Sequence, residues 1–165
     1  MEFVSRMMDA YDRKGVLPGP VPARFRMAQD SKMERLRQVP LLEDCTSRQL
    51  REIARIARVF EAPAGTVLTR VGEPGDEFFM ILDGAAGVEV PTGRRSELRP
   101  GDFFGEMSLI DEGPRSATVT AETGIRLLAI TRRHFTTLLR EAPGLTLKIL
   151  ATLSRRVREL EQSRG

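Results

Sequence analysis

The stretch that decides the fold is TVLTRVGEPGDEFFMILDGAAGVEV, residues 66–90. Short apolar or alternating runs (TVLTRV, FFMIL and AGVEV) are separated here by the turn sequences GEPGD and DGA. The same rhythm continues through ELRP, DFFGE, ATVTAE and IRLLAIT, with turn residues between the runs. About eight strands at this spacing predict an all-β, jelly-roll-like β-roll. The spacing leaves no room for the crossover helices that a parallel sheet needs.

Helical patterns flank the predicted roll on both sides. Before it, Thr46 and Gln49 form a capping box ahead of an apolar helical face. After it, one helix is expected over 134–142 and a second from Gly144 to the end, because Pro143 interrupts the pattern. The second helix carries a seam with the spacing of two heptads, formed by Thr146, Leu150, Leu153, Val157 and Leu160. We expect this seam to pack on the roll, with a homodimer through the C-terminal helix as the alternative. The predicted architecture is a β-roll with one N-terminal and two C-terminal flanking helices.

The chain of 165 residues divides into an arm and one domain. Residues 1–37 are expected to be an N-terminal arm that contains the linker GVLPGPVPAR, residues 15–24, because its prolines and glycines exclude a helix. An apolar stripe from Phe3 to Tyr11 is either a docking helix or a frayed end. Residues 38–165 form the domain.

Composition and charge exclude several classes of protein. An apolar fraction of 41% is typical of a globular chain, and no apolar run approaches the roughly 20 residues of a membrane span. The single cysteine, Cys45, and the absence of a signal peptide favour a cytoplasmic location. The net charge of +3 comes from the first 40 residues, with eight Lys/Arg against five Asp/Glu. These charges are mixed, so a solvated linker is favoured over a nucleic-acid-binding arm.

The sequence carries no recognisable catalytic or metal-binding set, and we expect the protein not to be an enzyme. The single histidine, His134, has no second histidine or cysteine with which to share a metal, and no nucleophile elbow or Walker motif is present. The acidic pairs lie in predicted turns, where carboxylates are usually solvated. A binding function is therefore favoured.

The chemistry lies in FGEMSLIDEGPRSATV, residues 104–119, which we call the cassette. Gly105 lets the backbone turn without a side chain, and the short GEMSLI segment fits one helical turn whose free amides face an anion. Arg115 returns after a Gly-Pro bend and can bind a phosphate with two parallel hydrogen bonds. Glu106 would repel a phosphate but can accept from a sugar hydroxyl, with Arg115 compensating its charge. Together these residues predict a site for a ribose phosphate.

The cassette resembles the phosphate-binding cassette of cyclic nucleotide-binding domains. That family's pattern is filled by Phe104, Gly105, Glu106, Ser108, Arg115, Ser116, Ala117 and Thr118. The preceding PAGTVLTRVGEPGDEFFMILDGAAGVEV also resembles the first strands of the family, and the resemblance spans about residues 38–163.

The resemblance implies a role for each matching residue. Glu106 would bind the ribose 2′-OH and Arg115 the cyclic phosphate. The rest of the phosphate cradle would come from Gly105, Met107, Ser108, Ser116 and Ala117. Val88, Phe103 and Met107 would be apolar walls, and the last helix would be a lid whose Arg155, Arg156 and Arg158 are candidates to touch the base.

The resemblance leaves the base and the wider role open. Ser116 is compatible with cAMP and cGMP, and we expect cAMP because it dominates among bacterial members, whose composition this chain resembles. One alternative is a truncated transcription regulator, since no DNA-binding element follows the lid helix. Another is a roll that has lost its ligand and serves as an interaction platform. In the favoured interpretation, ligand binding moves the C-terminal helices, and an unknown downstream protein responds.

Overall fold

The computed structural model describes residues 29–163. The stripe from Phe3 to Tyr11 and the linker at 15–24 lie outside the described residues. The elements in chain order are α2 (Gln29–Arg37), the 3-10 helix η2 (Pro40–Leu42), α3 (Ser47–Ile56), β1 (Arg58–Ala62), β2 (Val67–Thr69), β3 (Glu77–Asp83), β4 (Ala86–Glu89), β5 (Arg95–Leu98), β6 (Phe103–Phe104), α4 (Glu106–Ile110), β7 (Thr118–Ala121), β8 (Ile125–Thr131), α5 (Arg132–Glu141) and α6 (Pro143–Gln162).

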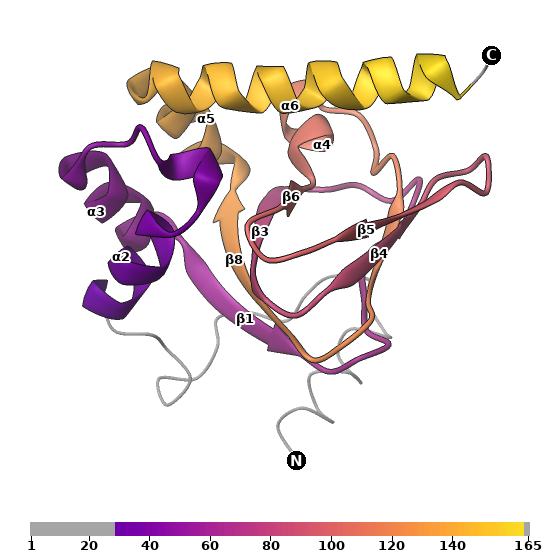
Figure 1. Cartoon of the computed structure of the whole chain (residues 1–165), viewed down its shortest axis with the longest axis horizontal. Helices are drawn as coiled ribbons and strands as arrows, with labels where there is room; N and C mark the ends of the chain where they lie inside the picture. Colours follow the sequence, from indigo (N-terminus) through magenta and orange to yellow (C-terminus); the bar gives the residue numbers. More distant parts are fainter. Residues whose placement is uncertain (1–28, 164–165) are drawn as a thin grey trace.

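Eight strands form two four-stranded sheets, which confirms the predicted β-roll. The first sheet has the order β1-β8-β3-β6 and the second the order β2-β7-β4-β5, with every pairing antiparallel. The pattern of runs did not include β1, whose sequence RVFEA alternates poorly. It is held by β8, where Phe60 pairs with Leu127. Figure 1 shows α6 lying across one end of the roll above α4, with α2 and α3 beside β1 and β8.

Alternation along β3 divides the core into two layers. Phe79 and Ile81 belong to the apolar cluster between the sheets. Phe78, Met80 and Leu82 point the other way, into a cluster that the helices cover. Because successive side chains of a strand point to opposite faces, a fully apolar strand such as FFMIL must be covered on both faces. The helices supply the second cover.

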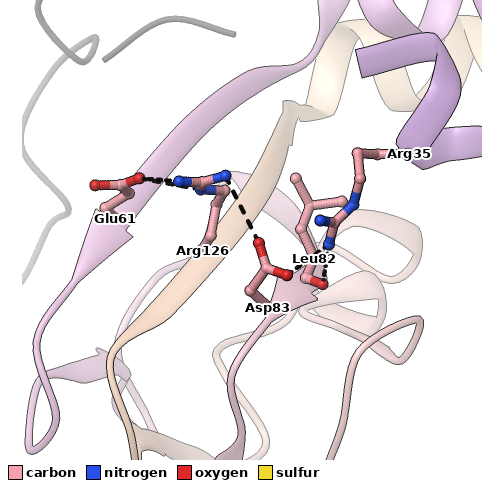
Figure 2. Close-up of polar contacts among 5 residues, drawn as sticks. All are labelled: Arg35, Glu61, Leu82, Asp83 and Arg126. Atoms are coloured by element: carbon pink, nitrogen blue, oxygen red, sulfur yellow. Dashed lines mark hydrogen bonds and ion pairs between the residues drawn. The ribbon is translucent and has the colours of Figure 1, made fainter. Parts of the chain in front are cut away.

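Helix α2 packs on the domain although the sequence assigned residues 1–37 to an arm. Its Leu36 is fully buried in the cluster under the helices. Arg35 donates from Nη2 to the carbonyl of Leu82 and to the carboxylate of Asp83 at 2.7 Å. Asp83 in turn faces Arg126 on β8, and Arg126 binds Glu61 on β1, so the ion pairs cross three strands (Figure 2). We therefore propose that the domain begins with α2.

The flanking helices form where the sequence predicted them, with one difference in packing. The capping box at α3 is present, since Thr46 Oγ1 accepts from the Gln49 amide at 3.1 Å and Gln49 Oε1 accepts from the Thr46 amide at 2.9 Å. The expectation that the α6 seam packs on the roll is wrong for most of the seam. Leu150 and Val157 are 52% and 53% exposed, whereas the buried face of α6 is formed by Leu145 and Ile149.

Candidate functional site

The short helix α4 begins at Gly105, as the one-turn prediction required. Gly105 has φ 87° and ψ 0°, a left-handed conformation that favours glycine. A Cβ here would lie 2.7 Å from Nη1 of Arg115 and 2.8 Å from the carbonyl oxygen of Glu77. Both backbone conformation and space therefore require glycine at the junction between β6 and α4.

Arg115 lies inside the roll, and the backbone fixes its guanidinium. The residue is only 7% exposed. Its Nη1 donates to the carbonyl of Gly105 at 3.1 Å, and its Nη2 donates to the carbonyl of Glu77 at 3.0 Å. The guanidinium carbon lies 5.7 Å from the centre of the Phe79 ring. A guanidinium has five N–H donors, so three remain for an anion after these two bonds.

The loop between β2 and β3 forms the other wall of the Arg115 site. The Arg115 amide donates to the carbonyl of Glu73, and the Gly72 amide donates to the carbonyl of Arg115, both at 2.8 Å. A Cβ on Gly75 would lie 2.7 Å from Cδ of Arg115 and closer still to its Nε and Cζ. The GEPGD turn is thus part of the site and gives the arginine side chain its space.

Glu106 is buried at the start of α4, and its ion-pair partner is Arg156. Glu106 is 3% exposed, and its Oε1 accepts from Nη1 of Arg156 at 3.0 Å. Nη2 of Arg156 donates to the carbonyl of Phe103 at 2.9 Å, and its guanidinium carbon lies 4.9 Å from the centre of the Phe103 ring. Arg115 was expected to compensate Glu106, but in the described chain no hydrogen bond or ion pair joins them. The ion pair comes from Arg156 of the C-terminal helix, while the charge of Arg115 still acts against the rise in the pKa of Glu106.

Burial and neighbouring charges shift the pKa values of three groups in the site. Burial raises the pKa of Glu106, and the positive charges of Arg156 and Arg115 act against that rise. Burial lowers the pKa of Arg115, while the charges of Glu77 and Glu106 support its protonated form. Burial also raises the pKa of Glu77, and Oε2 of this carboxylate is buried without a hydrogen-bond partner. Arg115 therefore carries its charge in a poorly solvated place, where an anionic group bound to its remaining donors would stabilise the protonated guanidinium.

The remaining predicted residues surround these groups at different depths. Met107 is 47% exposed on α4, and its sulfur accepts from the exposed Ser116 hydroxyl at 3.6 Å. Ser108 is buried, and the carbonyl of Ala117 accepts from Thr69 Oγ1 at 3.2 Å. Val88 is partly buried on β4 against the cluster between the sheets.

Phe103, expected as an apolar wall of the site, packs its ring under the helices. Its ring belongs to the cluster under the helices, 5.5 Å from the Phe78 ring. The next residue, Phe104, stacks on Phe79 at 5.0 Å between the sheets. Phe103 contributes to the site through its carbonyl and ring, which hold Arg156.

Comparison with known protein families identifies the family to which the chain belongs. Residues 59–142 match the cyclic nucleotide-binding domain family. This chain belongs to that family. The match covers the strands of the roll, the cassette and α5, and it ends before α6, which supplies Arg156.

Relatives of the cyclic nucleotide-binding domain family support the assignment. A cyclic nucleotide-gated potassium channel of Mesorhizobium japonicum is 44% identical over 105 residues, covering 64% of this chain and 29% of the channel. A solved structure of cAMP-bound PfPKA-R has a TM-score of 0.70 at 25% identity, covering 81% of this chain and 45% of that one. The Thermus thermophilus catabolite activator protein has a TM-score of 0.67 at 29% identity, covering 75% and 61%. The chain thus spans less than a third of the channel's length.

The comparisons find a cyclic nucleotide-binding domain and no catalytic domain. Within residues 29–163, no cluster of three or more His, Cys, Asp or Glu side chains could hold a metal ion. No helix in this part of the chain is long and apolar enough to cross a bilayer.

Sequence reasoning missed two residues that touch the site. Glu77 follows the predicted turn GEPGD directly, and its carbonyl accepts from Arg115. Arg132 lies two residues before His134 and donates to the carbonyl of Ser108 in α4 at 3.1 Å. Glu77 left a signal in the sequence, since the expected strand begins directly after it.

Proposed function

We propose that this domain binds a cyclic nucleotide and acts as a regulatory module. The observation that carries the proposal is Arg115, a buried guanidinium oriented by two backbone carbonyls with donors left for an anion. Burying an arginine without a carboxylate in hydrogen-bonding contact costs free energy, so such a residue favours a site that a phosphate completes. Gly105 and the first turn of α4 add backbone amides beside it.

Glu106 is proposed to accept a hydrogen bond from the ribose 2′-OH. Because Arg156 on α6 also binds Glu106, a ligand that contacts this carboxylate alters an interaction of the last helix. We propose that ligand binding shifts the population of α5 and α6 positions over the site. The shift can be no larger than the difference in ligand affinity between the two states.

For the base, we propose cAMP in preference to cGMP. The channel relative is named as cyclic nucleotide-gated, and a relative from Aspergillus niger, 32% identical over 126 residues, is named as a cAMP-dependent protein kinase regulatory subunit. A solved relative was captured with cAMP. The exposed Ser116 hydroxyl, engaged only by the sulfur of Met107, is the group next to Arg115 through which a base could be distinguished.

Titration calorimetry with cAMP, cGMP and 5′-AMP tests the proposal. We expect heat of binding with cAMP, weaker binding with cGMP and none with 5′-AMP at the same concentration. Absence of heat with both cyclic nucleotides would refute the binding proposal and favour the interaction platform. Tighter binding of cGMP would overturn the base assignment alone.

Two substitutions test the proposed phosphate contact and the proposed ribose contact separately. Arg115→Lys should weaken cAMP binding by about 10- to 100-fold, since a charged hydrogen bond is worth about 1.5–3 kcal/mol and each 1.4 kcal/mol is tenfold. Glu106→Gln should weaken cAMP binding less and should leave binding of 2′-deoxy-cAMP almost unchanged. An equal loss for both nucleotides would show that Glu106 does not read the 2′-OH.

A homodimer through α6 is a second proposal that the apolar exposure of this helix favours. Its exposed large apolar residues are Leu147 at 66%, Leu150 at 52%, Val157 at 53% and Leu160 at 49%. Singly exposed leucines are ordinary, but three of these four residues, Leu150, Val157 and Leu160, belong to the predicted seam. Sedimentation should therefore give a dimer that Leu150→Glu converts to monomer. A monomer across the micromolar range would exclude this dimer.

A cytoplasmic location and an effector protein outside this chain are proposed from the sequence. The intact cassette argues against a roll that has lost its ligand. Glu106 and Arg115 are both present and buried, and Gly105 has the left-handed conformation that begins α4.

A further inference from the structure

Arg132, the first residue of α5, connects three segments behind the phosphate site. Its Nη2 donates to the carbonyl of Gly75 at 2.9 Å and to the carbonyl of Ser108 at 3.1 Å. Its Nε lies 3.3 Å from Oδ1 of Asp76, and its Nη1 lies 3.7 Å from Oε1 of Glu112. The Arg132 amide also donates to the carbonyl of Asp76 at 2.9 Å. One side chain therefore joins the β2–β3 loop, α4 and the cassette loop to the beginning of α5.

The segments that Arg132 holds are those that position Arg115. Gly75 lies directly against the Arg115 side chain, and Glu112 precedes Arg115 by three residues in the cassette loop. Ser108 is in the middle of α4, whose first turn is offered to the ligand. A ligand that shifts α4 or this loop must move the carbonyls that Arg132 binds, or break these hydrogen bonds.

Arg132 also stands at the only covalent route from the roll to the lid. It directly follows β8, and α5 leads through Ala142 into α6. The buried Phe135 and Leu138 of α5 make apolar contacts with the domain, and at the far end of α5 Gln49 Nε2 donates to the carbonyl of Glu141 at 3.4 Å. Apolar contacts tolerate sliding because they have no direction, whereas a guanidinium bound to two carbonyls fixes distance and angle.

We propose that Arg132 is the positioning residue that couples occupancy of the cassette to the position of α5 and α6. The inference rests on the proposed function, since it requires a ligand at Arg115. In the ligand-free protein, Arg132 sets the distance between α4 and the first turn of α5. When the ligand draws α4 and the β2–β3 loop toward the phosphate, Arg132 carries α5 with them, and α6 follows.

Hydrogen exchange of the full chain, with and without saturating cAMP, tests the coupling. In the wild type we expect cAMP to change exchange in peptides of both α4 and α6. In Arg132→Gln we expect the α4 change to persist and the α6 change to be lost. Affinity should fall by about 3- to 30-fold, the usual range for residues that carry coupling between sites. Arg132→Lys, which keeps the charge but replaces the planar guanidinium with one compact ammonium group, should restore part of the α6 response.

Arg133→Gln is the matched control. It removes the same charge from the same helical turn, and Arg133 is exposed, with no hydrogen bond or ion pair from its guanidinium in the described chain. It should behave as wild type. If Arg132→Gln does not fold, Asp76→Asn provides the second variant, because the Asp76 side chain is 77% exposed. It should reduce the α6 response while leaving the α4 response intact.

The outcomes distinguish the coupling from the binding proposal. If wild-type protein gives no heat with cAMP, the proposed function fails. If wild type binds cAMP and α6 of Arg132→Gln responds as in wild type, Arg132 has only a structural role and the inference is wrong. A wild type in which cAMP changes α4 but not α6 also overturns the coupling, while binding stands.

Discussion

Gly75→Ala should weaken cyclic-nucleotide binding by about 10- to 100-fold, although Gly75 itself does not contact the ligand in our proposal. The new methyl group would lie 2.7 Å from Cδ of Arg115 and nearer still to Nε and Cζ, separations that real Cβ atoms do not show. Gly75 is not in the left-handed region, so alanine adds no backbone strain, and the effect is purely one of space. The arginine has to leave its position.

The expected loss of ligand affinity follows from the hydrogen bonds of Arg115. A displaced Arg115 gives up its hydrogen bonds to the carbonyls of Gly105 and Glu77, and with them its orientation toward a phosphate. One charged hydrogen bond lost to the ligand is worth about 1.5–3 kcal/mol, or about 10- to 100-fold in affinity. The free energy of unfolding should fall by only about 1 kcal/mol, since the side chain can turn toward solvent and water can replace it at the carbonyls.

Gly124→Ala is the matched control for this experiment. Gly124 is also outside the left-handed region, and a Cβ there meets no atom within 4 Å. Calorimetry with cAMP and urea unfolding should be run on both variants. Gly75→Ala should lose affinity and keep most of its stability, while Gly124→Ala keeps both. Wild-type affinity in Gly75→Ala, with Arg115→Lys still impaired, would refute the role given to this wall.

Three further predictions concern single residues. Glu77→Gln should gain stability over wild type as the pH rises above 4.5. Burial raises the pKa of the Glu77 carboxyl, so the wild type loses stability as this carboxyl ionises in the folded state, whereas glutamine does not ionise. Urea midpoints of the two proteins should diverge from pH 4 to 8, and parallel curves would contradict this. Arg156→Gln should speed cAMP dissociation, measured by stopped flow, by about 5- to 30-fold. The substitution leaves Glu106 buried without its ion pair and removes the contact that joins α6 to α4. An unchanged rate would show that Arg156 does not hold the lid. Thr46→Ala should lower the free energy of unfolding by about 0.5–2 kcal/mol, since the Gln49 amide loses its acceptor, and equal urea midpoints for variant and wild type would refute the cap's contribution.

The cassette could be predicted because its geometry is local. Gly105, the one-turn helix and the return of Arg115 all lie within a dozen residues, and each depends on backbone preferences that the residue types carry. The regular spacing of the turns likewise predicted the β-roll, because strand length and turn chemistry are short-range properties. These features required no knowledge of which distant segments meet.

The partners of the charged residues could not be predicted in the same way. Glu106 and Arg156 are 50 residues apart and meet only because α6 crosses above α4. The acceptors of Arg115 are backbone carbonyls, which every residue has, so no residue type marks them. The predicted burial of the α6 seam was wrong for a related reason. The helix has apolar residues on two faces, and only tertiary packing decides which face is buried.

Three arginines from different segments hold the surroundings of the cassette. The carbonyls that accept from them belong to Gly105, Glu77, Gly75, Ser108 and Phe103. Strand β6 has two residues and α4 has five, so neither has enough internal hydrogen bonds to fix its own position. The position of α4 therefore depends on Arg115, Arg132 and Arg156. Since buried carbonyls are costly to leave unpaired, α4 cannot shift without moving these arginines or losing their bonds. Two of the three lie in α5 and α6, so the C-terminal helices are the part of the domain on which a change at the cassette would act in the response that we propose.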